Sequence, residues 1–568
     1  MPKRTLSVSL MTLREIFSAA FAFQLPWFQR AYAWQTAQAG RLLADVSEEM
    51  DRPDACRYQL GNLMLAQRDL NRTDASTADA NRLAIIDGHQ RLMTLTILFA
   101  VLRDLEDDPT IKAEYADLIV AAPTSRRAVE TYRLAPQPRL TEFLAAHVQR
   151  EGATAVAPDM DCDAMSETER NIIENRDLLR TELEAADVSI ERRRALARFL
   201  LDECTAIVRL ASSEDWAWQM LRIEETTRLD FTAADSAKAS LLGVMAPADR
   251  NEAARIWEDC ESRLGSTQTY ELLSHVRIIG LRRRTSAPIE TDLCRSFELD
   301  RSGLAFMRDI LAPHAAALAR LREAESAAET DPTWRDILAA RNLMGWINHQ
   351  SWLPAAVHWL NVRTTSDGET STFFRRLERL VWLQRIASVD PERQVSRYLA
   401  VLSDIDSGAP VDTCASLAVE PKLKARVLSA LDAVNFRGRR VAPLVLRRLC
   451  LDGEMPPADP SALRPRLTVE HILPQNPPDG SEWLRAFGSM RKVKDHTNRL
   501  GNLTLLTAVD NHDAGNLDWP SKAKVLGSSL VSLSREAATV PEWTPEVIRE
   551  RSRRLTCRLM KEWGLIEA

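Results

Sequence analysis

The middle of the chain, from about residue 110 to 430, repeats apolar residues at spacings of three and four. Clear cases are the stretches 171–208 and 373–389. This spacing gathers apolar side chains on one face of a helix, so both stretches are expected to be helical. No fixed internal period accompanies the pattern, which argues against a regular solenoid. At 568 residues the chain also exceeds what one hydrophobic core supports. A mainly α protein of several domains is therefore expected.

The first 105 residues differ from this helical pattern. Residues 57–69 and 82–87 alternate or run apolar like strands, and they lie among turn residues and one helical stretch. A small α/β module is therefore predicted at the N-terminus. The expected division is listed by range: 1–110 for the α/β module, 111–250 for its helical continuation, 251–415 for a helical middle region, and 416–568 for a C-terminal domain.

Bulk properties exclude several classes of protein. No apolar window of about 18 residues occurs, and Arg14 and Glu15 interrupt the start before a signal core can form. We therefore expect a cytoplasmic protein without a membrane partner. The eight cysteines come no closer in sequence than Cys260 and Cys294, which excludes CxxC motifs. The net charge of −6 argues against indiscriminate DNA adhesion, while a small basic excess after residue 431 permits contact with phosphates.

The C-terminal part carries an ordered set of polar residues. A strand-like "LTVEHIL" holds Glu470 and His471, a strand-like "GNLTLLT" holds Asn502, and a helix is expected to hold Asn511 to Lys522. This order is that of the ββα-metal site of HNH nucleases, where a histidine deprotonates water beside one divalent cation. Oxygen donors of this kind suit Mg²⁺ or Mn²⁺ better than zinc.

This C-terminal run resembles the nuclease module of GmrSD-type modification-dependent restriction enzymes. The shared elements are HIxPQ, GNLxLL and N-x4-N-x2-aromatic-x2-K, and residues 436–449 look like the helix that precedes the module. The resemblance implies that His471 is the general base, with Glu470 and Asn511 as metal ligands. It also implies that Asn502 fixes the loop or orients the histidine, and that Lys522 lies near phosphate. Asparagines are common turn and cap residues as well, and that interpretation suits Asn516 after Gly515.

The segment "AIIDGHQRLMTL" predicts a strand, a tight turn at Asp87 and Gly88, and a helix whose first turn holds His89, Gln90 and Arg91. Free amides at a helix start attract anions, and an arginine there can add a phosphate contact. The alternative is a capped helix with a solvated Arg91. The chain contains no GxxxxGK[ST], so an ordinary P-loop is excluded.

With "FQLPWFQRAYAW" upstream, this segment resembles the N-terminal module of the same family, which is similar to the ParB and sulfiredoxin fold. The resemblance implies binding and hydrolysis of a nucleoside triphosphate, with the nucleotide undetermined among GTP, ATP, CTP and UTP. The pocket residues it implies are Gln29, Arg30, Asp87, Gly88, His89, Gln90 and Arg91. His89 stands where the family has glutamine. For Trp27, Phe28, Tyr32 and Trp34, packing is the expected role.

A weaker likeness lies in residues 221–242. Asp235 and Lys238 match a family pattern there, while Glu225 and Arg228 depart from it. Asp235 and Lys238 alone also read as a pair on a helix surface.

The combined hypothesis is a metal-dependent HNH DNA endonuclease that is regulated by a nucleoside triphosphate and hydrolyses it. The resemblance implies that it restricts modified phage DNA. The sequence does not determine whether the chain forms a homo-oligomer. Two alternatives remain: an NTP-independent nuclease whose N-terminal module recognises DNA, and a non-catalytic sensor with a decayed nuclease.

Overall fold

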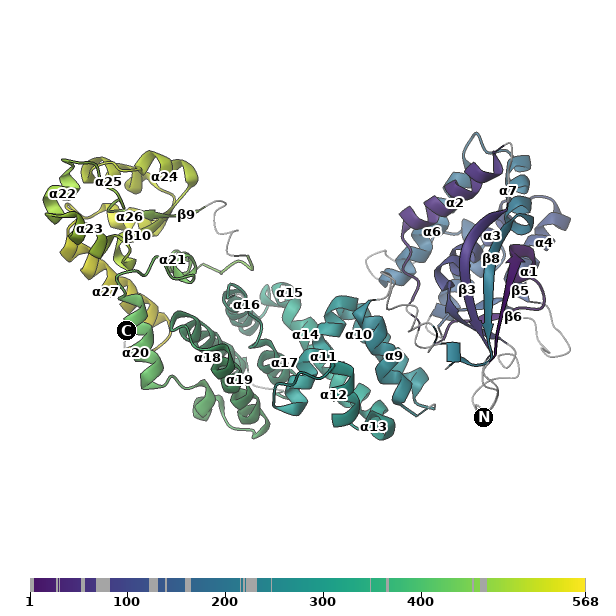
Figure 1. Ribbon diagram of the computed structural model, residues 1–568, viewed down its shortest axis with the longest axis horizontal. Coiled ribbons are helices and arrows are strands. Elements are labelled where there is room, and N and C mark those ends of the chain that lie inside the picture. The colour runs from purple at the N-terminus through teal and green to yellow at the C-terminus, as the bar shows by residue number, and fades with distance from the viewer. Residues whose placement is uncertain are drawn as a thin grey trace. The chain divides into compact units, whose positions relative to one another are not determined.

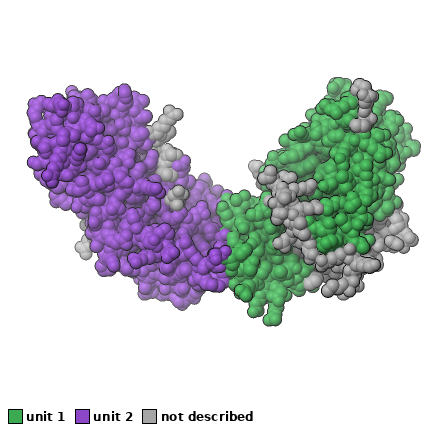
Figure 2. Space-filling model, viewed as in Figure 1, with its two compact units in different colours: residues 1–273, 287–312 green, residues 274–286, 313–568 purple. Residues whose placement is uncertain are grey.

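The computed structural model describes most of the chain. The described residues are 5–26, 29, 31–52, 57–67, 82–121, 131–137, 140–158, 165–214, 216–217, 220, 232–246, 248–347, 349–363, 367–451, 454–459 and 467–566. Internal contacts divide the chain into two compact units, residues 1–273 with 287–312 and residues 274–286 with 313–568 (Figure 2). Across the described residues, no helix is both long and apolar enough to cross a membrane.

The first unit is built on a mixed sheet of six strands in the order β1-β8-β3-β4-β2-β7 (Figure 1). Its strands are β1 (Leu6–Thr12), β2 (Phe23–Gln24), β3 (Tyr58–Ala66), β4 (Leu83–Asp87), β7 (Leu134–Ala135) and β8 (Cys204–Ala211). A separate pair joins β5 (Val120–Ala121) and β6 (Thr131–Tyr132) in antiparallel register. The strands predicted at 57–69 and 82–87 are confirmed as β3 and β4.

One expectation about the first unit was wrong. The stretch 171–208 was expected to be helical to its end, but the helix ends at Asp202 and Cys204–Ala211 forms β8. β8 lies between β1 and β3, antiparallel to the former and parallel to the latter. Its β-branched Thr205, Ile207 and Val208 suit a strand inside a sheet. The sheet therefore draws on residues far beyond position 110.

Helices cover this sheet, and α3 lies almost wholly within the core of the unit. α3 contacts α4, α6 and α7, and α2 packs on α6 (Figure 1). The helices up to β8 are α1 (Leu13–Ile16), α2 (Thr36–Met50), α3 (His89–Asp104), α4 (Pro109–Ile119), α5 (Thr141–Leu144), η2 (Ala145–Gln149), η3 (Ala153–Ala155), α6 (Glu167–Glu184) and α7 (Ile190–Asp202).

From residue 233 to 449 the described chain is helical, as its periodicity predicts. The elements are α9 (Ala233–Val244), α10 (Arg250–Leu264), α11 (Ser266–Leu281), α12 (Ile289–Ser296), α13 (Leu299–Ala305), η5 (Phe306–Leu311), α14 (Ala312–Arg322), α15 (Ala324–Ala328), α16 (Pro332–Gly345), α17 (Leu353–Val362), α18 (Asp367–Ile386), α19 (Pro391–Asp406), η6 (Val411–Thr413), η7 (Ala415–Leu417), α20 (Pro421–Leu431) and α21 (Ala442–Leu449). The helix expected at 373–389 is confirmed as α18.

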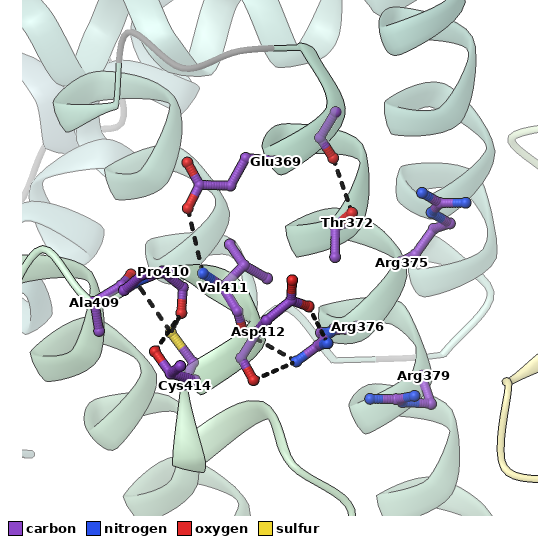
Figure 3. A network of polar contacts seen from close by, with 12 residues as sticks. Glu369, Thr372, Arg375, Arg376, Arg379, Ala409, Pro410, Val411, Asp412 and Cys414 are labelled. Atoms are coloured by element: carbon purple, nitrogen blue, oxygen red, sulfur yellow. Dashed lines mark hydrogen bonds and ion pairs between the residues drawn. The ribbon is translucent and has the colours of Figure 1, made fainter.

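Polar contacts fix α18 to the segment that follows α19 (Figure 3). Arg376 donates to the carbonyls of Val411 and Asp412 at 3.0 and 3.3 Å and pairs with the Asp412 carboxylate. Glu369 accepts from the Val411 amide at 3.2 Å. Side chains thus satisfy backbone groups that no regular element pairs.

The C-terminal part of the second unit packs around Trp483, Trp519 and Trp543. Its elements are β9 (Thr468–His471), α22 (Glu482–Phe487), α23 (Met490–Thr497), η9 (Leu500–Asn502), β10 (Leu503–Leu506), α24 (Ala508–Ala514), α25 (Trp519–Ser528), α26 (Ser532–Ala538) and α27 (Pro545–Glu562). Both predicted strands are confirmed. At the start of α27, Thr544 accepts from the Val547 amide and Pro545 occupies the first turn, as the sequence predicts.

The single helix expected from Asn511 to Lys522 is instead two helices. α24 ends at Ala514 and α25 begins at Trp519. Gly515 has φ of +33° at this break, and Pro520 lies in the first turn of α25, where its missing N–H costs nothing. The turn brings the start of α25 back toward β9, which positions Lys522.

Candidate active site

The core of the C-terminal site is the antiparallel pair β9–β10, in which His471 lies opposite Leu503 and Glu470 opposite Thr504. All four residues of β10 are buried. Glu470 is also buried, while His471, the last residue of β9, is partly exposed. The pair therefore rests on the core and presents His471 at its accessible end.

Lys522 is fully buried and braces this pair from within. Its Nζ lies 2.5 Å from Oε1 of Glu470 and donates to the carbonyls of His471 and Gly515, each at 2.8 Å. The ammonium thus joins α25, β9 and the turn at Gly515. The sequence predicted that Lys522 lies near phosphate. In the structure, the three contacts of its Nζ are all with groups of the protein.

Burial shifts both members of this ion pair in the direction of neutrality. It raises the pKa of Glu470 despite the opposing charge and hydrogen bond of Lys522. It lowers the pKa of Lys522 despite the opposing charge of Glu470. Each charge consequently depends on the other to remain ionised inside the protein.

Asn502 is fully buried, and its amide locks the loop after β9. Its Oδ1 accepts from the Leu473 amide at 2.7 Å and from the Trp543 indole at 3.0 Å. Its Nδ2 donates to the carbonyls of Leu473 and Thr497 at 3.0 and 2.8 Å. All of these bonds are internal, which matches the loop-fixing role among those predicted.

His471 presents Nε2 to two amide side chains, Oδ1 of Asn498 and Nε2 of Gln475, each at 3.1 Å. In the tautomer that carries its proton on Nδ1, Nε2 accepts from Gln475. Burial lowers the pKa of His471, and the positive charges of Arg437 and Lys522 act in the same direction, against the hydrogen bond of Asn498. The lowered pKa favours the neutral imidazole, which is the form able to take a proton.

Asn511 lies at the other end of β9, where its Nδ2 donates to Oγ1 of Thr468 at 2.7 Å. Thr468 and Glu470 are two residues apart on one strand, so their side chains share a face about 7 Å apart. The neighbouring His512 is exposed. Lys522 thus joins Glu470 to the His471 carbonyl, whereas Asn502 bonds the loop after β9 and Asn511 bonds the start of that strand.

The donor set can be tested against a divalent cation. Within the described residues, no group of three or more His, Cys, Asp and Glu side chains has a metal-binding arrangement. Glu470 and Asn511 supply oxygen donors on one face of β9, although Lys522 already engages one carboxylate oxygen. Two protein oxygens fit Mg²⁺ or Mn²⁺, which retain several waters and share phosphate oxygens. They do not fit zinc, which favours nitrogen and sulfur.

Arg437 is a site residue that the motifs did not single out. Its backbone N–H donates to the Asn498 carbonyl at 3.0 Å, and its charge lowers the pKa of His471. Its Nε is buried and has no hydrogen-bond partner within the described part of the chain. In the sequence, only its place in "FRGRR" pointed to Arg437. Gln475, which contacts His471, is the glutamine of "HILPQ".

The predicted N-terminal pocket residues mostly hold the fold of the first unit. Gln90 accepts from the amides of Ala33 and Trp34 at 2.9 and 3.1 Å and contacts Nε2 of His89 at 2.7 Å. Gln29 donates to the Ile86 carbonyl at 2.5 Å. His89, Gln90 and Gln29 are all buried. These side chains tie the segment before α2 to the start of α3.

Arg91 is likewise directed inward, where its Nη1 donates to the carbonyls of Leu60 and Asn62 at 2.6 and 3.0 Å. Gly61, with φ of +94°, leaves room for it, because a Cβ there would lie 3.1 Å from Nη1. Gly88, with φ of +91°, makes the predicted tight turn, and its amide donates to Asp87 at 2.8 Å. The structure therefore does not show the solvated Arg91 of the alternative reading.

Asp235 and Lys238 are buried and do not form a surface pair. Asp235 closes a capping box with Thr232 at the start of α9. Lys238 pairs with Glu258 at 3.2 Å and reaches the Gln29 carbonyl at 3.5 Å. The remaining predictions for Arg30, Trp27, Phe28, Glu225 and Arg228 lie outside the described residues.

Comparison with known families covers both of these regions. Residues 13–264 match the model of the N-terminal domain of the GmrSD restriction endonuclease, and residues 428–557 match the model of the C-terminal domain of GmrSD restriction endonucleases. No curated protein matches the chain. The DGHQR segment falls in the first match, and His471 and Arg437 fall in the second.

Proposed function

The chain belongs to the GmrSD restriction endonuclease family, and on that basis we propose that it is a divalent-metal-dependent DNA endonuclease with His471 as its general base. The observation that carries this proposal is the state of that imidazole. Its pKa is lowered, it lies at the accessible end of β9, and in the Nδ1–H tautomer its Nε2 accepts from the Gln475 side chain. A neutral, positioned histidine is what proton abstraction from water requires.

The surrounding residues divide into positioning and binding roles. Asn502 fixes the loop that follows His471, and Lys522 holds the His471 carbonyl and the Glu470 carboxylate. Glu470 and Asn511 would hold Mg²⁺ or Mn²⁺. The cation would offset negative charge on the scissile phosphate.

Arg437 is proposed as the residue that binds the scissile phosphate. Arg437 as a whole is partly exposed, and a guanidinium matches two phosphate oxygens at once. Its influence on the pKa of His471 places its charge near the base. A phosphate bound there would lie beside the water that His471 activates.

The test is nicking of supercoiled plasmid with Mg²⁺ or Mn²⁺, using His471→Ala. The matched control is His512→Ala, which removes an exposed imidazole from the same module. We expect His471→Ala to lose about 10²–10⁴-fold in rate, and His512→Ala to retain wild-type activity. Equal nicking by the wild type and His471→Ala would reject His471 as the base and point to the decayed-nuclease alternative.

Regulation by a nucleoside triphosphate, with hydrolysis, is the second part of the proposal, and it rests on the N-terminal family match. A specific observation favours the alternative of a recognition module: the side chains of Gln90 and Arg91 are engaged in internal hydrogen bonds. Plasmid assays with and without triphosphate separate the two. Cleavage that is unchanged by triphosphate, together with no turnover of it, would support the recognition module.

Restriction of modified phage DNA is proposed on the same family basis. Matched plasmids with and without base modification, assayed with the same protein, test it directly. Faster cleavage of modified DNA is expected. Equal cleavage rates on both plasmids would reject selectivity for modified DNA. They would not contradict the nuclease activity.

A further inference from the structure

A cavity of about 700 Å³ opens at the β7 edge of the sheet in the first unit. This volume lies in the usual range of small-molecule sites. Its lining residues are Gln24, Arg82, Val120, Thr131, Tyr132, Leu134, Ala135, Pro136, Thr141 and Gln149. None of the predicted pocket residues is among them.

The walls of the cavity are held in place by hydrogen bonds to backbone carbonyls. Arg82 donates to the carbonyls of Phe23, Tyr132 and Arg133 at 2.8 to 3.1 Å. Gln24 donates to the Pro136 carbonyl at 3.1 Å. Such a cavity is largely formed before any ligand arrives, which lowers the entropy lost on binding.

Polar groups in the lining retain unused hydrogen-bonding capacity. Oγ1 of Thr131 is buried and has no partner among the described residues. Gln149 donates through its amide nitrogen to the Leu134 carbonyl at 2.8 Å, and in the described structure nothing donates to its oxygen. A buried hydroxyl without a partner is unfavourable, so it indicates a missing water or ligand.

The charge of the lining restricts the ligand. Among the described lining residues there is no carboxylate and one cationic side chain, Arg82, which is engaged with three carbonyls. A triphosphate would find no free cation among these residues. An uncharged, flat molecule with donors and acceptors fits better, because the lining includes the aromatic Tyr132 and the apolar Leu134 and Val120.

We propose that this cavity binds an uncharged purine or pyrimidine base. The base has the ring N–H and amino donors that the Gln149 oxygen lacks, and acceptors for the Thr131 hydroxyl. It can come from a free nucleotide or from a DNA base turned out of its duplex. This inference is independent of the nuclease chemistry of the second unit.

The test uses the full-length protein carrying His471→Ala, without divalent metal, so that the result does not depend on cleavage. Calorimetric titration with adenosine, guanosine, cytidine and thymidine reports the free base. Fluorescence of 2-aminopurine, placed at a mismatch in a duplex oligonucleotide, reports a base turned out of DNA. A signal in either arm supports the cavity and identifies the source.

Two added substitutions assign that binding to the cavity. Thr131→Val removes only the unpaired hydroxyl, so affinity should fall roughly fivefold to tenfold while the melting temperature holds or rises. Thr141→Trp fills the exposed rim and should abolish binding. Thr110→Val, at an exposed position of α4, is the control and should bind normally. No signal in either arm, or binding that Thr131→Val and Thr141→Trp leave unchanged, would overturn the proposal.

Discussion

The DGHQR turn of the first unit and the EHILPQ strand of the second are equally recognisable motifs, yet the structure uses them differently. In the turn, Arg91 donates to two backbone carbonyls and Gln90 accepts from two amides. At the strand, Lys522 and Asn502 take that bracing role. His471 is left accessible there, and Arg437 is left with an unpaired donor.

The comparison shows that motif strength does not separate scaffold from chemistry. Hydrogen-bonding capacity that the fold leaves unused makes that distinction. By this criterion the C-terminal motif retains reactive groups. The N-terminal motif is mainly structural, whereas Thr131 in the cavity at β7 has a buried hydroxyl without a partner among the described residues.

The largest predicted effect concerns Lys522. Replacing it with methionine leaves the Glu470 carboxylate buried without its cation, so the C-terminal module should lose about 3–5 kcal/mol of stability. Hydrogen exchange in peptides from β9 and α25 measures the local loss. Lys524→Met, at an exposed position of α25, is the control and should change little.

A phosphate-binding Lys522 would give the opposite pattern. Lys522→Met would then weaken DNA binding while exchange in β9 and α25 stayed normal. Adding Glu470→Gln to Lys522→Met removes the unpaired charge and should restore much of the lost stability. Failure of that rescue would contradict the brace described here.

The next effect in size is at Arg91. Arg91→Met removes the hydrogen bonds to Leu60 and Asn62, and should destabilise the first unit by about 2–3 kcal/mol. Exchange in β3 should rise while exchange in β9 stays unchanged. If Arg91→Met instead removed triphosphate binding at unchanged stability, the N-terminal motif would be a nucleotide site and the contrast would fail.

A smaller effect is expected at Arg437. Arg437→Gln should weaken DNA binding about tenfold and reduce the salt dependence of the binding constant by about one ion. Fluorescence anisotropy of a labelled duplex over a salt series measures both. Stability should hold, because the Arg437 Nε has no partner to lose. An unchanged salt dependence of the binding constant would contradict a contact between Arg437 and a phosphate.

Local patterns predicted much of this fold. The strands β3, β4, β9 and β10, the turn at Gly88 and the start of α27 all follow from short-range spacing and turn chemistry. β8 was missed, because its place between β1 and β3 depends on pairing with residues more than a hundred positions away. The sequence analysis merged α24 and α25 into one expected helix, although Gly515 and Pro520 mark the break between them.

The residues of the candidate site could be proposed from the sequence motif, but the contacts of their side chains could not. The sequence predicted Glu470, His471, Asn502, Asn511 and Lys522 as site residues, and their catalytic and metal-binding roles stay predictions. Whether a lysine faces solvent or a buried carboxylate depends on tertiary packing, so the ion pair of Lys522 could not be foreseen. Arg437 lies 34 residues before His471 in the chain, and only the fold shows that its charge acts on the imidazole.

The most direct test of the central claim is the pH dependence of single-turnover nicking. Because the pKa of His471 is lowered, the base stays deprotonated below the ordinary histidine pKa near 6.5, and the rate should fall only at more acidic pH. Arg437→Gln removes a nearby positive charge, so its acid limb should move to higher pH. A wild-type limb above pH 6.5, or a limb that Arg437→Gln leaves unmoved, would contradict the account.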